Sequence, residues 1–401
     1  MRRHPSFRAA LASPLLIPLL LSAPPAGAQT LTLGNDIGLT ISGILSATMF
    51  TSDARFGLGN GQQANFVLNE LEDWWHGGDV RNMRLTMKLT GPAFSGDWRA
   101  NATVEGDLFG GFNAGNFGDE QPVPRLRLAY AEVTNGRTTF RVGQDWSLTL
   151  GNIPVSVSHI GFPFGWGSGG FIGWRFTGLF FDQALTAPTA TTKATVRLAV
   201  MKNSWSDAAT ADQPSVGEAG TPQLEARINL EGRLDPGSWG LYLVGHWDEK
   251  DLNSVRPRGS PEPPENNLTS TALEAGARVQ AGALTVHGNA YTGKAMGHQF
   301  AHIVQFGDIQ GWGAWAQAGF DLSSRWSLWL YYGMDNPDDE DFSAAGDRQK
   351  SALLVPMIRF KVGPYSTGLE LMKSWVDFRT AAGGTEERTG TSVLYSVRYD
   401  F

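Results

Sequence analysis

The sequence has no cysteine, few charged residues and no long apolar run after its first 28 residues. Without cysteine, the chain cannot be a disulfide-stapled module or hold a thiolate metal site. The 39 Asp and Glu residues outnumber the 32 Lys and Arg residues, which is the opposite of the balance in a nucleic-acid-binding protein. Glycine is frequent instead, with 49 residues, and aromatic residues make up 11% of the chain. This composition favours a turn-rich β protein.

The first 28 residues have the three parts of a secretory signal peptide. Arg2, Arg3 and Arg8 give a positive start, and an apolar stretch follows over residues 11–23. Two prolines interrupt this stretch, which is also shorter than the ~20 residues of a spanning helix. Small residues at 26–28 then suit signal peptidase. We expect residues 1–28 to be removed and residues 29–401 to form one exported domain.

The exported part alternates with a period of two. Every second residue of 98–107 is polar, and the residues between are small or apolar. Residues 83–89 and 224–231 show the same alternation, which is typical of a strand with one wet face and one apolar face. The pattern predicts sixteen strands, at residues 36–50, 81–91, 97–108, 123–134, 137–146, 171–182, 193–203, 222–232, 237–249, 269–281, 283–293, 311–322, 324–335, 350–362, 364–377 and 390–401.

Strand length and connection length indicate a membrane. Ordinary globular strands have about five or six residues, whereas a tilted strand that crosses a bilayer needs ~9–11. Most of the expected strands have at least ten. Short turns such as Asn135-Gly136 alternate with long loops such as residues 51–80 and 147–170, as in outer-membrane barrels. Hydrocarbon cannot form hydrogen bonds with the backbone N–H and C=O groups of an open sheet edge. We therefore expect an all-β fold: a closed, 16-stranded antiparallel transmembrane β-barrel with both termini at the periplasmic side.

Aromatic residues near the strand ends suit the girdles of such a barrel. A soluble β-propeller or sandwich is the competing architecture, but it would have shorter strands, and a propeller would have a fixed repeat that the sequence lacks. The expected girdle residues are Trp98, Trp239, Trp326, Tyr365 and Phe401 at the periplasmic ends, and Trp247, Trp312 and Trp375 near the outer ends.

Arginine is frequent on the strand face that should line the lumen. Because neighbouring strands share one wall, these side chains could form a positive strip at one depth and attract anions. For any single arginine, a solvated lining held by its own salt bridges is the plainer interpretation. The expected pore-lining residues are Arg84, Arg99, Arg125, Arg127, Arg141 and Arg175, with Glu105, Asp107 and Asp145 beside them.

The third long loop, residues 147–170, has no charged side chain unless His159 is protonated. It also contains Phe162, Phe164 and Trp166, and an exposed loop is rarely so apolar. We expect it to fold into the barrel as a constriction opposite the arginines; a flap at a subunit contact is the alternative. Residues 335–341 and 70–73 are acidic and are interpreted as solvated outer loops, with binding of divalent cations as an open alternative.

Catalytic patterns are scarce. The chain has no HExxH, GxSxG or P-loop motif. Ser156, Ser158 and His159 lie close together, but the sequence places no acid beside them. His287 and Asn289 could mimic an outer-membrane lipase site, yet His287 has the parity of the lumen and not of the lipid face. We expect no enzyme, no cofactor and no metal site.

Two sets of motifs resemble known proteins. The final strand, SVLYSVRYDF at residues 392–401, alternates apolar residues and ends in phenylalanine, and it resembles the C-terminal insertion signal of bacterial outer-membrane proteins. EGDLFG at 105–110, LRLAY at 126–130 and FRVGQDWS at 140–147 resemble the DcaP-like branch of trimeric porins. The close resemblance covers residues 83–147, and the chain lacks the N-terminal coiled-coil extension of some members. The resemblance to this family implies sixteen strands, an inward third loop, a homotrimer and a preference for organic anions, including dicarboxylates.

Together these features predict a bacterial outer-membrane porin for passive diffusion of small hydrophilic solutes, with a preference for anions such as organic acids. The expected partners are the lipid bilayer, lipopolysaccharide, two further copies of the chain and small anionic solutes, with no nucleic acid. A substrate-specific channel with a saturable site and an outer-membrane barrel enzyme are the alternatives.

Overall fold

The computed structural model describes residues 29–110, 122–203, 220–251 and 267–401. The expected signal peptide, residues 1–28, lies outside these residues. The described chain is almost entirely β-structure, with four short 3-10 helices. Its strands are β1 (Gln29–Leu33), β2 (Ile37–Phe56), β3 (Val67–Asp79), β4 (Arg84–Ser95), β5 (Trp98–Asp107), β6 (Arg125–Thr134), β7 (Thr138–Trp146), β8 (Arg175–Ala184), β9 (Thr192–Met201), β10 (Gly220–Leu234), β11 (Gly237–Asp251), β12 (Asn267–Ala281), β13 (Leu284–Lys294), β14 (Gln310–Asp321), β15 (Trp326–Pro337), β16 (Arg348–Val362), β17 (Tyr365–Arg379) and β18 (Thr385–Asp400).

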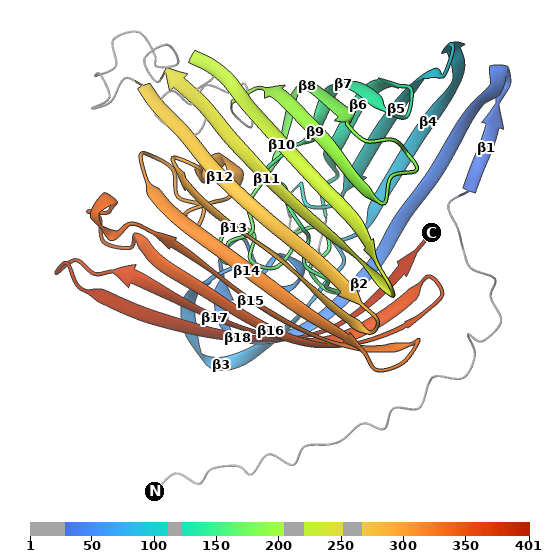
Figure 1. The fold of residues 1–401 in the computed structure, drawn as a ribbon. Coiled ribbons are helices and arrows are strands. Elements are labelled where there is room, and N and C mark those ends of the chain that lie inside the picture. The colour runs from blue at the N-terminus through green and yellow to red at the C-terminus, as the bar shows by residue number, and fades with distance from the viewer. Residues whose placement is uncertain (1–28, 111–121, 204–219, 252–266) are drawn as a thin grey trace, which may run out of the picture.

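Sixteen of these strands form a closed antiparallel ring (Figure 1). The ring runs from β4 to β18, with each strand pairing with the next, and β2 closes it by pairing with both β4 and β18. The sixteen strands expected from the two-residue alternation are therefore confirmed. No helix of the described residues is long and apolar enough to cross a membrane.

Two additional strands lie along β2, which is 20 residues long. β1 pairs with residues 37–41 of β2, which precede the residues of β2 that pair with β18. β3 pairs with residues 48–56 of β2, which follow the residues of β2 that pair with β4. β3 lies within residues 51–80, which the alternation predicts as a long loop, because the LNELEDWWHGGD segment has charged residues and no strict alternation.

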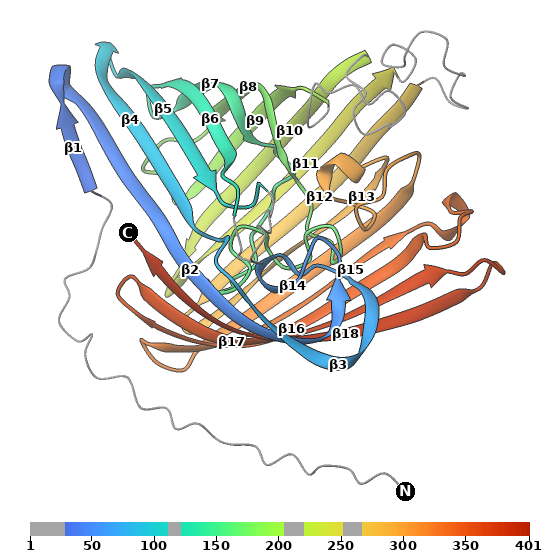
Figure 2. The ribbon, with the colours of Figure 1, turned by 180° about the vertical axis from the view of Figure 1, so that it is seen from behind.

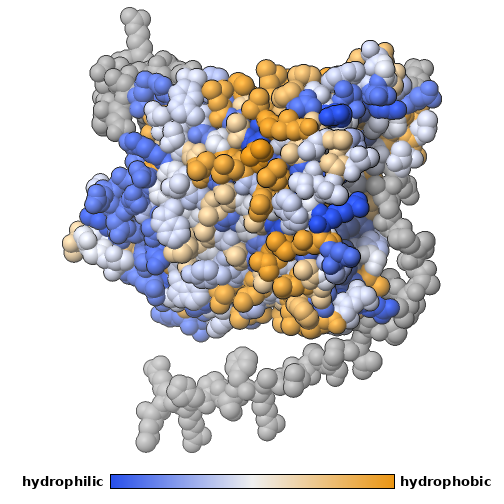
Figure 3. Space-filling model, viewed as in Figure 1, coloured by the Kyte–Doolittle hydropathy of each residue, from blue (hydrophilic) through white to orange (hydrophobic). Residues whose placement is uncertain are grey.

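The two faces of the ring differ as the alternation predicted. On β15, Leu328, Leu330 and Tyr332 point outward and are 43–50% exposed, whereas Trp329 and Tyr331 point inward and are at most 8% exposed. Figure 3 shows apolar surface over the middle of the strands and hydrophilic surface gathered at the left edge, where the long loops of β15–β18 lie. An exterior of this kind is stable only when an apolar medium covers it.

The inner face is less polar than the alternation alone suggested. On β14–β18, inward residues including Tyr331, Leu353, Val355 and Met372 are at most 1% exposed and belong to one apolar cluster. The cluster is completed by residues 50–67, from the end of β2 to the start of β3, and by residues 162–171 and 300–304 of two long connections. The expectation that the whole inner face meets water is therefore wrong for this wall, because inserted segments cover it and exclude water.

Candidate functional site

The connection between β7 and β8, residues 147–174, reaches strands far around the ring. Gln317 on β14 donates to the carbonyl oxygen of Val155 at 2.8 Å and accepts its N–H at 2.7 Å. Asn152 donates to one carbonyl oxygen on β12 and to one on β13, at 2.9 and 3.0 Å. Figure 2 shows the green trace of this connection within the ring of strands. These contacts place the connection across the space that the strands enclose.

Glu370 on β17 holds the middle of this connection. Its buried carboxylate accepts the hydroxyl of Ser156 at 2.7 Å and the N–H groups of Val157 and Ser158 at 2.9 and 3.1 Å. The Ser158 hydroxyl also contacts it. Several donors compensate the desolvation of a buried carboxylate. The sequence places no acid beside these serines, but Glu370 lies beside them in the structure. No local spacing could have revealed a partner more than 200 residues away.

His159 is a buried neutral residue of the same connection. Its Nδ1 contacts the Ser158 hydroxyl at 2.7 Å, and its Nε2 lies 2.9 Å from the carbonyl oxygen of Ala64. Because a carbonyl oxygen only accepts, Nε2 carries the proton. Burial lowers the pKa of His159 to about 3, so the imidazole is uncharged near pH 7. The ring stacks on Phe164, with 4.1 Å between centroids.

The aromatic side chains of the connection form a packed block. Trp166 lies 4.9 Å from both Phe162 and Trp174, and Trp174 stacks on Phe300 with 4.4 Å between centroids. Phe162, Phe164 and Trp166 are each at most 2% exposed. These three residues, expected on the constriction loop, therefore fill space within the ring and do not present open faces to a passing solute. Trp174 and Phe300 were missed, because nothing in the sequence links the two segments.

Phe300 comes from a second inserted segment, residues 295–309, here called the strap. Phe300, His302, Ile303 and Val304 have φ of 55–62°, in the left-handed region that β-branched residues rarely adopt. Arg348 on β16 donates through Nε to the carbonyl oxygen of Ile303 at 3.1 Å and through Nη2 to that of Val304 at 3.4 Å. These contacts compensate part of the backbone strain and hold the strap against the aromatic block.

Three of the expected arginines share two acids on β4–β6. Arg127 binds Glu105 at 2.7 Å and Asp107 at 2.8 Å, and both of its ion pairs are buried. Arg125 binds Asp107 at 2.7 Å. Arg84 lies 3.7 Å from Glu105. The inner wall therefore carries three guanidinium groups around two carboxylates.

Arg141 belongs to a separate, acidic group on β6–β9. It binds Asp145 at 2.7 Å and Glu132 at 3.3 Å, and lies 3.7 Å from Asp182. Arg197 on β9 adds a second cation, 2.8 Å from Asp182. With three carboxylates around two guanidinium groups, this part of the wall is not positive.

Arg175 is buried and yet has no ion pair within 4.0 Å among the described residues. Its guanidinium carbon lies 4.4 Å from the ring centroid of Trp174 and 4.8 Å from that of Trp146. The residue is 4% exposed, and its Nη1 has no hydrogen-bond partner. Arg125 and Arg127 also lie over these two indole rings, at 5.8 and 5.3 Å. A fourth guanidinium thus joins the group around Glu105 and Asp107.

The six arginines do not lie at one depth. Arg99 pairs with Thr134 beside the β6–β7 turn, whereas Arg125 pairs with Asp107 at the opposite end of β5. The two positions are eight residues apart on β5, which is about 26 Å along the strand. Arg141 pairs with Glu132 at an intermediate level. The expected single strip is therefore wrong, since backbone register and not sequence order sets the height of each side chain.

No protein family matches the sequence, and no curated protein matches it. Solved structures do match. The outer membrane channel DcaP of Acinetobacter baumannii has a TM-score of 0.66 at 14% identity, over 91% of this chain and 97% of that chain.

Two further neighbours have the same architecture. Salmonella typhi OmpF, solved in complex with daunomycin, has a TM-score of 0.57 at 8% identity, over 93% of this chain and 100% of that chain. A trimeric form of the Vibrio cholerae outer membrane protein OmpT has a TM-score of 0.53 at 10% identity, over 91% and 99%. At these identities the likeness concerns the fold, and the chain has the closed sixteen-strand barrel fold of bacterial outer-membrane channels.

Proposed function

We propose that the chain is an outer-membrane porin through which small hydrophilic solutes diffuse passively. The observation that carries this proposal is a closed ring with an apolar exterior and charged side chains on its inner wall. Such a ring satisfies its backbone in lipid and lines a path for polar solutes. A barrel enzyme fits less well, because Ser158 and His159 are buried and Glu370 binds the serine, leaving the imidazole without an acid.

We further propose that the passage favours anions such as organic acids. Arg84, Arg125, Arg127 and Arg175 surround only Glu105 and Asp107. Arg175 supports the proposal most directly, because a buried guanidinium without a carboxylate is costly unless an anion neutralises it. A local excess of positive charge between low-dielectric indole rings attracts anions.

Planar-bilayer recording tests both levels of the proposal. The purified barrel should give stable ion-conducting steps, and a KCl gradient should give a reversal potential on the anion side. Arg175→Gln should move this potential toward the cation side. The matched control is Arg137→Gln, an exposed arginine in the β6–β7 turn. An unchanged reversal potential in Arg175→Gln would contradict the proposed anion preference. Absence of any conductance would contradict the proposed porin function.

A substrate-specific channel is the second candidate. The placement of Arg175 between Trp146 and Trp174 favours it, because two flat rings beside a cation could hold a flat organic acid. Flux of an organic acid that saturates with concentration would indicate such a site, whereas linear flux would indicate diffusion alone.

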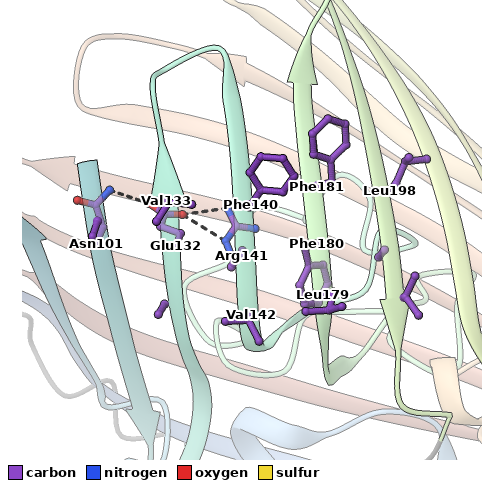
Figure 4. A pocket seen from close by; sticks show the side chains of 14 residues that line it. Asn101, Glu132, Val133, Phe140, Arg141, Val142, Leu179, Phe180, Phe181 and Leu198 are labelled. Carbon is purple, nitrogen blue, oxygen red and sulfur yellow. Dashed lines mark hydrogen bonds and ion pairs between the residues drawn. The ribbon is translucent and has the colours of Figure 1, made fainter. Parts of the chain in front are cut away.

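We propose that the barrel assembles as a homotrimer through its wall of short strands. β5–β9 have 9 or 10 residues, whereas β10–β18 have 11 to 16. The exterior of this wall carries an apolar recess of about 530 Å³. Figure 4 shows it, with Phe140, Val142 and Leu179 among its lining side chains, and these three are 50–60% exposed. A second copy of the chain would bury these residues against a similar apolar surface.

Mass measurement in detergent tests the assembly. A particle of three chains is expected for the native sequence. Val142→Arg should yield single barrels by placing a charge in the recess. Leu330→Arg on the opposite wall is the control and should leave three chains together. A single chain in the native sample would contradict the proposal.

A further inference from the structure

The two mouths of the barrel carry opposite charge. At the end with the short turns, basic side chains project inward from strand after strand. Lys88 on β4 lies opposite Thr103, an inward residue that is 7% exposed, and Arg99 shares the parity of Thr103 on β5. Lys193 on β9 lies opposite Glu231 on β10, and Arg233 follows at the next inward position of β10.

The same end of the other wall continues this series. Arg278 on β12 lies opposite His287, which is 2% exposed and points inward. Lys361 on β16 lies opposite the buried Ser366. Arg359 packs over the inward Trp329, with 5.3 Å to its ring centroid, and Arg398 on β18 lies opposite Ser366 as well.

These eight basic side chains are poorly neutralised. Near this end the inward acids of the described residues are Glu231, Asp321 and Asp400, together with Glu132 and Asp182, which are paired with Arg141 and Arg197. Of these eight basic side chains, only Arg398 forms an ion pair within 4.0 Å in the described part of the chain, with Asp400 at 2.6 Å. The turn-side mouth therefore has a surplus of positive charge.

The mouth with the long loops has the opposite surplus. Residues 51–73, 294–310, 336–350 and 377–389 contain 13 acidic and 6 basic side chains. Three of these basic residues are already engaged: Arg348 with strap carbonyl oxygens, Arg388 with Glu386 at 2.8 Å and Lys294 with Asp308 at 2.8 Å. Asp338, Asp339 and Asp377 line one recess of this mouth.

Opposite mouths of this kind make the number of mobile ions depend on the direction of the field. Near the acidic mouth the carriers are mainly cations, and near the basic mouth they are mainly anions, because fixed charge concentrates counterions. A field directed from the loop side to the turn side drives both kinds of carrier toward the middle of the pore. Ions then accumulate and conductance rises. The reverse field empties the middle and conductance falls.

We propose that this channel rectifies, passing more current when the loop side is positive than when it is negative. The inference rests on the proposed porin function but not on the anion preference, which depends on the arginines in the middle of the wall. Rectification should weaken as salt rises, because the Debye length shortens from about 10 Å at 0.1 M to about 3 Å at 1 M.

Single-channel current–voltage curves in symmetric KCl test the proposal. The orientation of each inserted channel is determined with Ser343→Cys, a substitution in an exposed loop of this cysteine-free chain. A membrane-impermeant thiol reagent added to one chamber then reports which chamber the loops face. The expected current ratio at +100 and −100 mV is about two in 0.1 M KCl and about one in 1 M KCl.

A double variant, Arg278→Gln with Lys361→Gln, removes two inward charges of the basic mouth. It should bring the ratio in 0.1 M KCl close to one while channels still open. The matched double control, Arg137→Gln with Arg325→Gln, removes two exposed turn charges outside the inward series and should keep the ratio. Linear curves in the native channel, or an unchanged ratio in the inward variant, overturn the inference and leave the porin standing. Absence of any current overturns both.

Discussion

The carboxylate of Glu370 lies 2.9 Å from the backbone N–H of Val157, a residue 213 positions earlier in the chain. This contact fixes the crossing connection to the far wall of the barrel. It also marks the place where a single substitution should loosen the interior without disturbing the ring.

Glu370→Ala should release residues 147–170 from β17. Removing a buried acceptor leaves the N–H groups of Val157 and Ser158 without an acceptor, at a cost of about 1–3 kcal/mol for each unsatisfied group, and the Ser156 and Ser158 hydroxyls lose one partner each. We expect larger single-channel conductance and more open-channel noise, with an unchanged far-ultraviolet spectrum. Glu231→Gln, an exposed carboxylate of the inner face, is the control. Conductance equal to the native value would show that the connection does not narrow the path.

The same connection should loosen in acid through His159. The pKa of this residue is about 3 in the folded state and ~6.5 in an open state, so opening takes up a proton between these values. The stabilisation from neutral His159 is complete above pH ~6.5 and decreases as pH falls toward 3, reaching a loss of about 2 kcal/mol at pH 5. Hydrogen exchange of residues 147–170 at pH 7.5 and 5, corrected for intrinsic rates, measures this. His159→Gln should remove the dependence; if it persists there, another group is responsible.

Arg348→Gln should free the strap. The variant loses the donors to the Ile303 and Val304 carbonyl oxygens, while the left-handed backbone still costs about 1–2 kcal/mol per residue. We expect faster hydrogen exchange across residues 295–309 and movement of Phe300 away from Trp174. Lys350→Gln, exposed on the same strand, is the control. Equal exchange in both variants would mean that packing alone holds the strap.

Gly170→Ala should displace the end of the connection from β14. Gly170 has a φ of +76°, and a Cβ there would lie only 2.3 Å from the backbone nitrogen of Ala314. Both the left-handed backbone and the clash act against the side chain, so we expect a loss of at least about 2 kcal/mol in local stability. Gly245→Ala, where a Cβ would meet open space, is the control. Exchange rates of residues 165–174 report the difference.

The sequence was most informative about the ring. Period-two alternation located its sixteen strands, because each strand must separate an apolar face from a polar one. It could not reveal that β3 adds to β2, since the acidic residues of β3 hide the alternation.

The interior was less predictable, because its contacts join segments far apart in the chain. The sequence does not indicate that Arg127 contacts Asp107 or that Glu370 contacts Ser156, because only the backbone register brings these polar residues together. The apolar inner residues of β14–β18 likewise look like exceptions to the alternation until the inserted segments cover them.

The pairing of β18 with β2 has a consequence for biogenesis. Residues 392–400 meet residues 44–52, so the seam of the cylinder joins the first strand of the ring to the last one along the chain. A ribosome-bound or truncated product lacks one side of that seam and retains two open borders. The ring can therefore close only once β18 is present, and until then the unpaired edges of the sheet are open to pairing with other polypeptides.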